Sequence, residues 1–166
     1  MSSPTYSLSE RVSSSFNILS IAAANLNAAS DELAKSITSL ESAFKQLNLG
    51  ISSWVTATSS SDETGLFYSL RQIGYDRIDG KWGIALRTVS GREDEEPGQE
   101  RTESWLFNDG PRSLRLEVID KLPDLIETLA KEAAEAAEKI KKKASQTQAI
   151  ATAIIPLAKT ESKARK

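Results

Sequence analysis

The residues of this sequence most able to do chemistry are two groups of carboxylates. Glu132, Glu135 and Glu138 recur at every third position, which places them on one side of a helix. Helical bundles that hold two metal ions combine such glutamates with a histidine, but the chain contains no histidine. Since Lys139 and Lys142 follow at the i,i+4 spacing of helical ion pairs, we interpret the group as a solvated helix face.

The second group is the acidic run 93–96 in the segment GREDEEPGQE. Adjacent carboxylates could hold a divalent cation. The run lacks the alternating oxygen ligands and the central glycine of an EF-hand loop, and a run of like charges is ordinarily a solvated loop. We therefore predict no metal site.

The residue types and motifs that the sequence lacks exclude several other kinds of catalytic site. It contains neither cysteine nor histidine, which excludes thiolate nucleophiles, disulfides, Cys/His zinc sites and His-based acid–base mechanisms. It has no phosphate-binding glycine loop, no dinucleotide fingerprint and no G-x-S-x-G nucleophile elbow. The sequence thus predicts a protein that is not an enzyme and that uses no cofactor.

A candidate binding site lies on a predicted β-hairpin. The dipeptide Asp79-Gly80 favours a two-residue turn, which pairs Ile78 with Lys81 and fixes the register. One face then carries a strip with few side chains, rimmed by polar groups and formed by Gln72, Gly74, Asp76, Gly83, Ala85 and Arg87. The strip is either an ordinary solvent face where glycine permits twist, which we prefer, or a shallow groove for a small molecule or peptide.

Two tracts with heptad spacing at the ends of the chain must position these groups. Both repeat apolar residues at alternating intervals of four and three, the a/d pattern of a coiled-coil seam. The first seam is Val12, Phe16, Leu19, Ala23, Leu26, Ser30, Leu33, Ile37, Leu40, Phe44 and Leu47. The second is Leu122, Ile126, Leu129, Ala133, Ala136, Ile140, Lys143, Thr147, Ile150, Ile154 and Leu157. Because the seams are equally long, we expect two long antiparallel coiled-coil-like helices, over 7–48 and 122–158, paired as a hairpin.

Between the helices the alternation of apolar and polar residues becomes typical of strands. We predict an antiparallel β-meander of about four strands over 51–107, with Tyr75 and Ile84 on its core face. The expected fold class is α+β, one domain over 1–166, with the inserted sheet at one tip of a rod.

The meander is followed by further helix. Asn108 or Asp109 should cap a short helix over 111–121, whose apolar stripe packs on the core face of the sheet. Pro156 should fray or kink the last turn of the final helix, and 159–166 forms a basic tail.

The first helix carries apolar residues beyond its seam. A hairpin cannot cover both stripes, and an uncovered apolar patch usually marks an interface. We predict a homo-oligomer, dimer or tetramer, with an interface that includes Ile18, Ile21, Ala22 and Ala29. The alternative is that the insert or the short helix covers this stripe.

Charge and hydropathy bear on partners and location. The net charge is −2 and no nucleic-acid-binding motif is present, which argues against nucleic acid despite the lysines at 139 and 141–143. The apolar segment 16–29 lacks the positive start of a signal peptide and the length of a membrane span. With the absence of cysteine, this predicts a cytoplasmic protein that does not bind membranes.

These observations predict a non-enzymatic, self-associating helical scaffold that binds another macromolecule, with a protein partner that the sequence does not identify. One alternative is a ligand-responsive regulator that uses the groove on the meander. A second is a weak nucleic-acid binder that uses the lysine-rich C-terminal helix, for which a steep salt dependence is expected.

Overall fold

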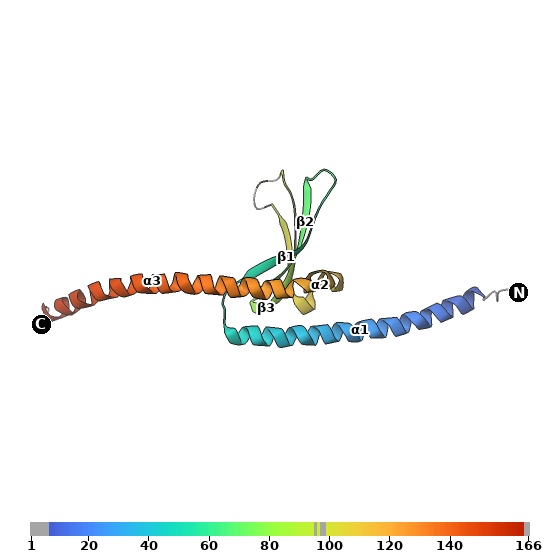
Figure 1. The fold of residues 1–166 in the computed structure, drawn as a ribbon, viewed down its shortest axis with the longest axis horizontal. Coiled ribbons are helices and arrows are strands. Elements are labelled where there is room, and N and C mark those ends of the chain that lie inside the picture. Colours follow the sequence, from blue (N-terminus) through green and yellow to red (C-terminus); the bar gives the residue numbers. More distant parts are fainter. Residues whose placement is uncertain (1–6, 95, 97–98, 165–166) are drawn as a thin grey trace.

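The computed structural model describes residues 7–94, 96 and 99–164, with side chains as far as Leu157. A four-stranded sheet stands at the middle of an elongated molecule, and a helix extends from this centre towards each end (Figure 1). The sheet therefore lies at the centre of the molecule, and its predicted place at one tip of a rod is wrong.

The first helix, α1 (Leu8–Leu47), has clear signals at both ends. Ser7 and Glu10 form a capping box, in which the Ser7 hydroxyl accepts from the Glu10 amide and the Glu10 carboxylate accepts from the Ser7 amide. At the other end Asn48 adopts the left-handed conformation with φ of 49°, which asparagine tolerates at a helix C-terminus. The predicted bounds 7–48 correspond to this helix together with its two caps.

The sheet consists of β1 (Ser53–Ser61), β2 (Phe67–Ile78), β3 (Lys81–Arg92) and β4 (Arg101–Leu106), antiparallel and in that order. The predicted meander is present. Asp79 and Gly80 have φ values of 48° and 82°, as a type I′ turn requires, and Ile78 pairs with Lys81. The predicted register of the hairpin is confirmed.

After β4 the chain forms three short helical segments, η1 (Phe107–Asp109), α2 (Arg112–Val118) and η2 (Ile119–Lys121), and then the long helix α3 (Leu122–Ala164). The predicted caps are wrong: Pro111 holds the N-cap position of α2, and no side chain caps the helix. The side-chain Nδ2 of Asn108 instead donates to Ala34 O and to Thr38 Oγ1, both at 3.2 Å, and so links η1 to α1.

The last helix does not end where proline was expected to disturb it, because α3 continues through Pro156 to Ala164. Within the described backbone, residues 159–164 therefore belong to α3. The side chains of the predicted basic tail, and residues 165–166, lie outside the described residues.

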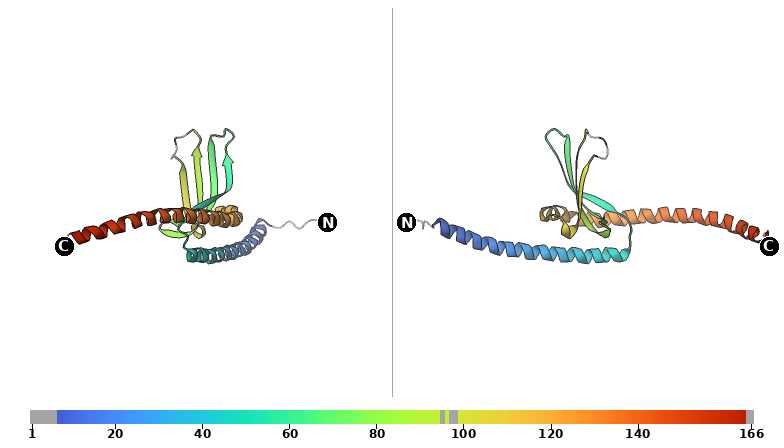
Figure 2. Two further views of the ribbon diagram at one scale, coloured as in Figure 1. Left: turned by 60° about the vertical axis from the view of Figure 1, so that its left-hand side comes forward. Right: turned by 180° about the vertical axis from the view of Figure 1, so that it is seen from behind.

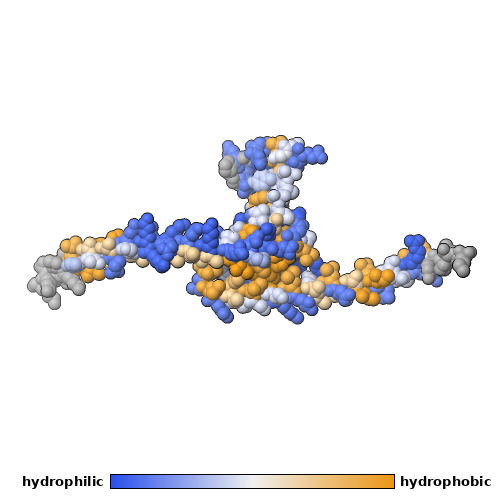
Figure 3. Space-filling view, viewed as in Figure 1, coloured by the Kyte–Doolittle hydropathy of each residue, from blue (hydrophilic) through white to orange (hydrophobic). Residues whose placement is uncertain are grey.

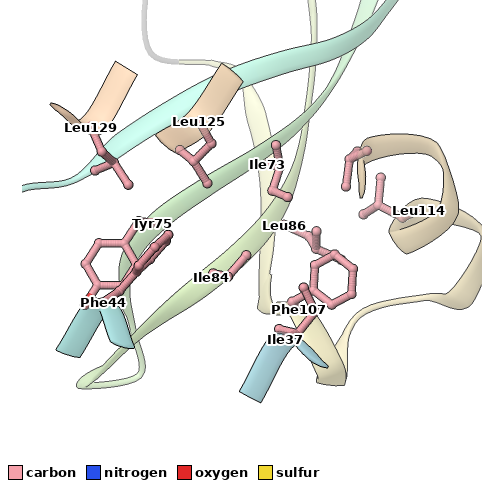
Figure 4. Packing of buried hydrophobic residues seen from close by; sticks show 11 residues of the cluster. Ile37, Phe44, Ile73, Tyr75, Ile84, Leu86, Phe107, Leu114, Leu125 and Leu129 are labelled. Carbon is pink, nitrogen blue, oxygen red and sulfur yellow. The ribbon is translucent and has the colours of Figure 1, made fainter. Parts of the chain in front are cut away.

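The core forms where the half of the sheet that contains Tyr75 and Ile84 meets the helices (Figure 4). Ile37 of α1, Phe107 of η1 and Leu125 of α3 are at most 1% exposed. The Phe44 ring meets the Tyr75 ring edge-on, with centroids 5.6 Å apart. Tyr75 and its neighbour Ile84 lie on the predicted core face and are buried. The apolar stripe of the short helix also enters this core, as expected.

The expected fold of two long antiparallel coiled-coil-like helices is wrong, although the class is α+β. α1 and α3 run in the same direction along the molecule and overlap only beside the sheet, each leaving at an opposite end (Figures 1 and 2). The sheet competes with the opposite helix for the seam residues. The shared core contains Ile37 and Phe44 of the first seam and Leu129 of the second. It also contains Leu125, which adjoins the second seam. Heptad spacing defines an apolar face, but it does not define the partner of that face.

Candidate interaction surface

The N-terminal half of α1 is an exposed apolar helix. We call residues 8–26 the α1 arm. Each of its side chains is exposed, and Phe16 keeps 69% of its surface and Leu19 keeps 62%. A shallow hollow runs along the seam between Leu8 and Leu19. The seam residues here thus meet solvent, whereas the residues at the other end of the same seam are buried.

The C-terminal half of α3 has the same character. We call residues 137–157 the α3 arm. All of its side chains except Ala151 are exposed. The large apolar side chains are 53–67% exposed, and they are Ile140, Ile150, Ile154, Ile155 and Leu157. At about 1.5 Å per residue, each arm is roughly 30 Å long.

Hydrogen bonds mark where the α1 arm leaves the rest of the molecule, which we call the body. Arg112 Nη2 donates to Asn27 Oδ1 at 3.0 Å, and Arg115 Nη2 donates to Ser30 Oγ at 3.4 Å. Ser30 is also the first residue of α1 with a partly buried side chain. On α3 the corresponding boundary is Ala136, which is partly buried, because the side chains of residues 137–150 are exposed.

The structure separates the four residues that were predicted to form an oligomer interface. Ile18, Ile21 and Ala22 are exposed on the α1 arm. Ala29 is exposed too, but it lines a small pocket beside Arg112 and Leu116 of α2. None of the described residues of the body covers the stripe that carries the first three residues.

A third apolar area lies on the body between the helices. Leu47 is 64% exposed and Ile126 is 42% exposed, and they border a hollow of about 130 Å³ that is also lined by Phe44, Leu129 and Ala133. Figure 3 shows this apolar area at the middle of one face, with further apolar surface along both arms.

The predicted groove on the meander is occupied by the chain's own side chains. Its six residues share one face of the sheet, as their register requires. β1 places Trp54 beside Gly74, and a Cβ at Gly74 would lie 2.4 Å from Trp54 Cδ2. The indole therefore lies in the space that the missing side chain leaves. The Arg87 guanidinium stacks 4.1 Å from the centre of the indole, within the range of a cation–π interaction.

Polar residues around the indole bind one another. Trp54 Nε1 donates to Asp76 Oδ2 at 3.1 Å. Arg87 Nε donates to Gln72 Oε1, and Gln72 Nε2 donates to Thr56 Oγ1 at 2.8 Å. Burial alone would raise the pKa of Asp76, but hydrogen bonds from Ser52, Arg77 and Trp54 and the charge of Arg87 outweigh it and lower that pKa. The rim of the predicted groove is thus a structural network.

Gly83, the other glycine of the strip, is covered by α1. A Cβ there would lie 2.8 Å from Glu41 Oε1 and 3.0 Å from Leu106 Cδ2. Glu41 Oε1 accepts a hydrogen bond from Ile84 N at 3.0 Å, at the part of β3 that extends beyond its pairing with β4. Burial raises the pKa of the Glu41 carboxyl, although this hydrogen bond opposes the effect.

Trp54 and Glu41 are the residues that sequence reasoning missed. The Asp79-Gly80 turn fixes the register of β2 against β3, but β1 joins β2 through a longer loop. β1 also has an irregularity between Thr56 and Thr58, so alternation alone could not place Trp54 opposite Gly74. Glu41 carried no signal, because its role depends on how α1 crosses the sheet.

The carboxylates form no cluster of the kind that holds a metal ion, as far as the described residues show. Glu138 is bound to Lys141 at 2.8 Å and is exposed, so its partner lies three residues away, in place of the predicted Lys142. Asp94 pairs with Arg92 at 2.8 Å. Glu95, which belongs to the acidic run, lies outside the described residues.

The fold and surface define a class: an α+β protein whose small body carries two exposed helical arms. Within the described residues, no helix is both long enough and apolar enough to cross a membrane. No protein-family model, curated protein or solved structure matches the chain.

Proposed function

We propose that this protein is a non-enzymatic scaffold that self-associates through its helical arms and presents its sheet to another macromolecule. The exposed apolar seams of the two arms carry this proposal. Monomeric proteins rarely expose contiguous apolar patches larger than a few hundred Å². A single exposed helix is also marginal in water, because most helical stability in proteins comes from packing an apolar face.

The distal half of the sheet is the surface that we assign to the second partner. It rises clear of all three helices (Figure 2), so it stays accessible when the arms are paired. Phe67 lies there, half exposed, with Arg92 stacked on its ring at 4.7 Å. Aromatic and arginine side chains are enriched at protein interfaces, which favours a protein partner over nucleic acid.

The same observations support a non-enzymatic role and disfavour the ligand-responsive alternative. The polar residues at the rim of the strip are engaged with one another, and Trp54 fills the strip that a ligand would need. We further propose a cytoplasmic location, because a chain without cysteine suits a reducing compartment.

The test of self-association is the mass of the protein in solution, measured by light scattering over a range of concentrations, with X-ray scattering on the same sample. We expect the mass of a dimer or a tetramer. A monomeric mass at every concentration, with an elongated profile that keeps both arms free, would overturn the proposal.

A further inference from the structure

We propose that the partner of each arm is the opposite arm of a second copy: the α1 arm of one chain pairs antiparallel with the α3 arm of the other. This inference rests on the proposed self-association and specifies its geometry. A two-fold axis perpendicular to the long axis of the molecule reverses the direction of every helix. Since α1 and α3 run the same way in one chain (Figure 1), this symmetry makes α1 and the partner's α3 antiparallel.

The two arms match in length and in where they begin. The α1 arm leaves its body at Ser30, and the α3 arm leaves at Ala136. If these two residues lie side by side in the dimer, every seam position of the α1 arm faces a seam position of the partner's α3 arm. Phe16 then faces Ile150 of the second chain, and Leu26 faces Ile140. Each layer pairs an a position with a d position, as in an antiparallel coiled coil.

The charged seam position of the α3 arm also fits this register. Lys143 faces Ala23, so that its aliphatic stem can cross a small side chain while the ammonium group reaches water. The α1 arm has no charged residue between Val12 and Leu26. The lysines at 139 and 141–143 therefore meet no like charge on the helix that they face.

Pairing of identical arms is less favourable. A two-fold axis along the molecule would place both α3 arms in parallel, with the lysines at 139 and 141–143 of one chain beside the same lysines of the other. Like charges in such positions repel. Antiparallel pairing of two α1 arms alone would leave both α3 arms exposed.

The apolar area on the body favours the mutual arrangement as well. The hollow beside Leu47 and Ile126 lies between the points where the two arms leave. When the α1 arm of each chain pairs with the α3 arm of the other, the two bodies are brought together and this apolar area can be covered. Two helical pairs of roughly 30 Å each, with the contact between the bodies, are on the scale of the roughly 1,200–2,000 Å² that a stable interface buries.

Engineered disulfides test this pairing directly, because the natural chain contains no cysteine. Chains with Phe16→Cys and chains with Ile150→Cys, distinguished by a tag, are mixed, allowed to exchange subunits and oxidised. We expect a disulfide-linked dimer that contains one chain of each kind, because facing seam positions bring the two Cβ atoms close together and a disulfide requires a Cβ separation of at most about 4.5 Å. The matched control combines Ser14→Cys with Thr152→Cys, which lie on the outer sides of the same helices and should not link.

The outcomes separate this inference from the proposed function. A monomeric mass for the unmodified chain would overturn both. An oligomeric mass, with links between two Phe16→Cys chains and between two Ile150→Cys chains but not between unlike chains, would overturn the antiparallel pairing and leave self-association standing. Linking of the control pair as efficiently as the seam pair would also count against the pairing.

Discussion

The body and the arms contain the two ends of the same heptad seams, yet they differ in what those seams contact. In the body, Ile37 and Phe44 pack against a sheet and are buried. In the α1 arm, Val12 and Phe16 occupy equivalent positions and remain 60% and 69% exposed. The sequence pattern is continuous across this boundary. A continuous seam can therefore serve two partners, one within the chain and one outside it.

The largest effect should come from a charge placed in the body. Ile37→Asp buries an unpaired carboxylate at a position that is 1% exposed, and such changes cost more than about 4 kcal/mol. We expect the variant to be unfolded or to lose most of its cooperative transition in circular dichroism. Ile18→Asp, an exposed position on the same helix, is the control and should leave the body folded. A normal melting curve for Ile37→Asp would contradict the core described here.

A charge placed in the seam of an arm should act on assembly alone. Phe16→Asp would put a carboxylate into a packed layer of each of the two arm pairs in the dimer. At roughly 1.5 kcal/mol for each layer, the total of about 3 kcal/mol weakens association about 100-fold. The unfolding of the dissociated body should not change. Sedimentation at several concentrations would measure the association. The comparison between body and arm fails if the variant unfolds the body and leaves the mass unchanged.

The two glycines on the meander should respond differently to alanine. Gly74→Ala forces a Cβ against the Trp54 ring and against Ser53 O, at 2.4 and 2.6 Å, and overpacking of this kind costs about 1–3 kcal/mol. Gly83→Ala meets the end of Glu41 at 2.8 Å, which can move, so the cost should be smaller. Urea unfolding of both variants measures the difference. Equal stability losses would show that the indole does not fix this face.

The smallest effect should be a pH dependence that originates at Glu41. Its pKa is raised from 4.5 in the folded protein, mainly by burial, so folding favours the protonated carboxyl. Stability should therefore fall as the pH rises from 4.5 through the folded-state pKa, and it should stay lower above that value. Glu41→Gln keeps an oxygen acceptor for Ile84 N and removes the titration. The difference in unfolding free energy between the two proteins, followed across this range, should vary with pH; a constant difference would contradict the raised pKa.

Local signals allowed part of the fold to be predicted. Ser7 and Asn48 mark the ends of α1 because capping depends only on neighbouring residues. The Asp79-Gly80 turn sets the register from Ile78 to Lys81 because a two-residue turn leaves no choice of pairing. These features depend on groups a few positions apart.

The partners of the seams and of the glycine strip could not be predicted in this way. Each is decided by competition between distant surfaces. The second half of the first seam packs into the core that the sheet shares with the helices. The strip beside Gly74 is filled because Trp54 arrives from a strand whose register the sequence left open. Neither the packing of the seam nor the position of Trp54 changes the spacing of residues along the chain, so the periodicity of the sequence cannot predict either.

The shared direction of α1 and α3 also decides whether growth of the assembly stops. If the arms pair antiparallel, two chains satisfy each other completely and the particle is finite. If an α1 arm instead pairs in parallel with the α3 arm of a chain related by simple translation, each addition exposes a new free arm. The chains would then extend into a filament without a natural end.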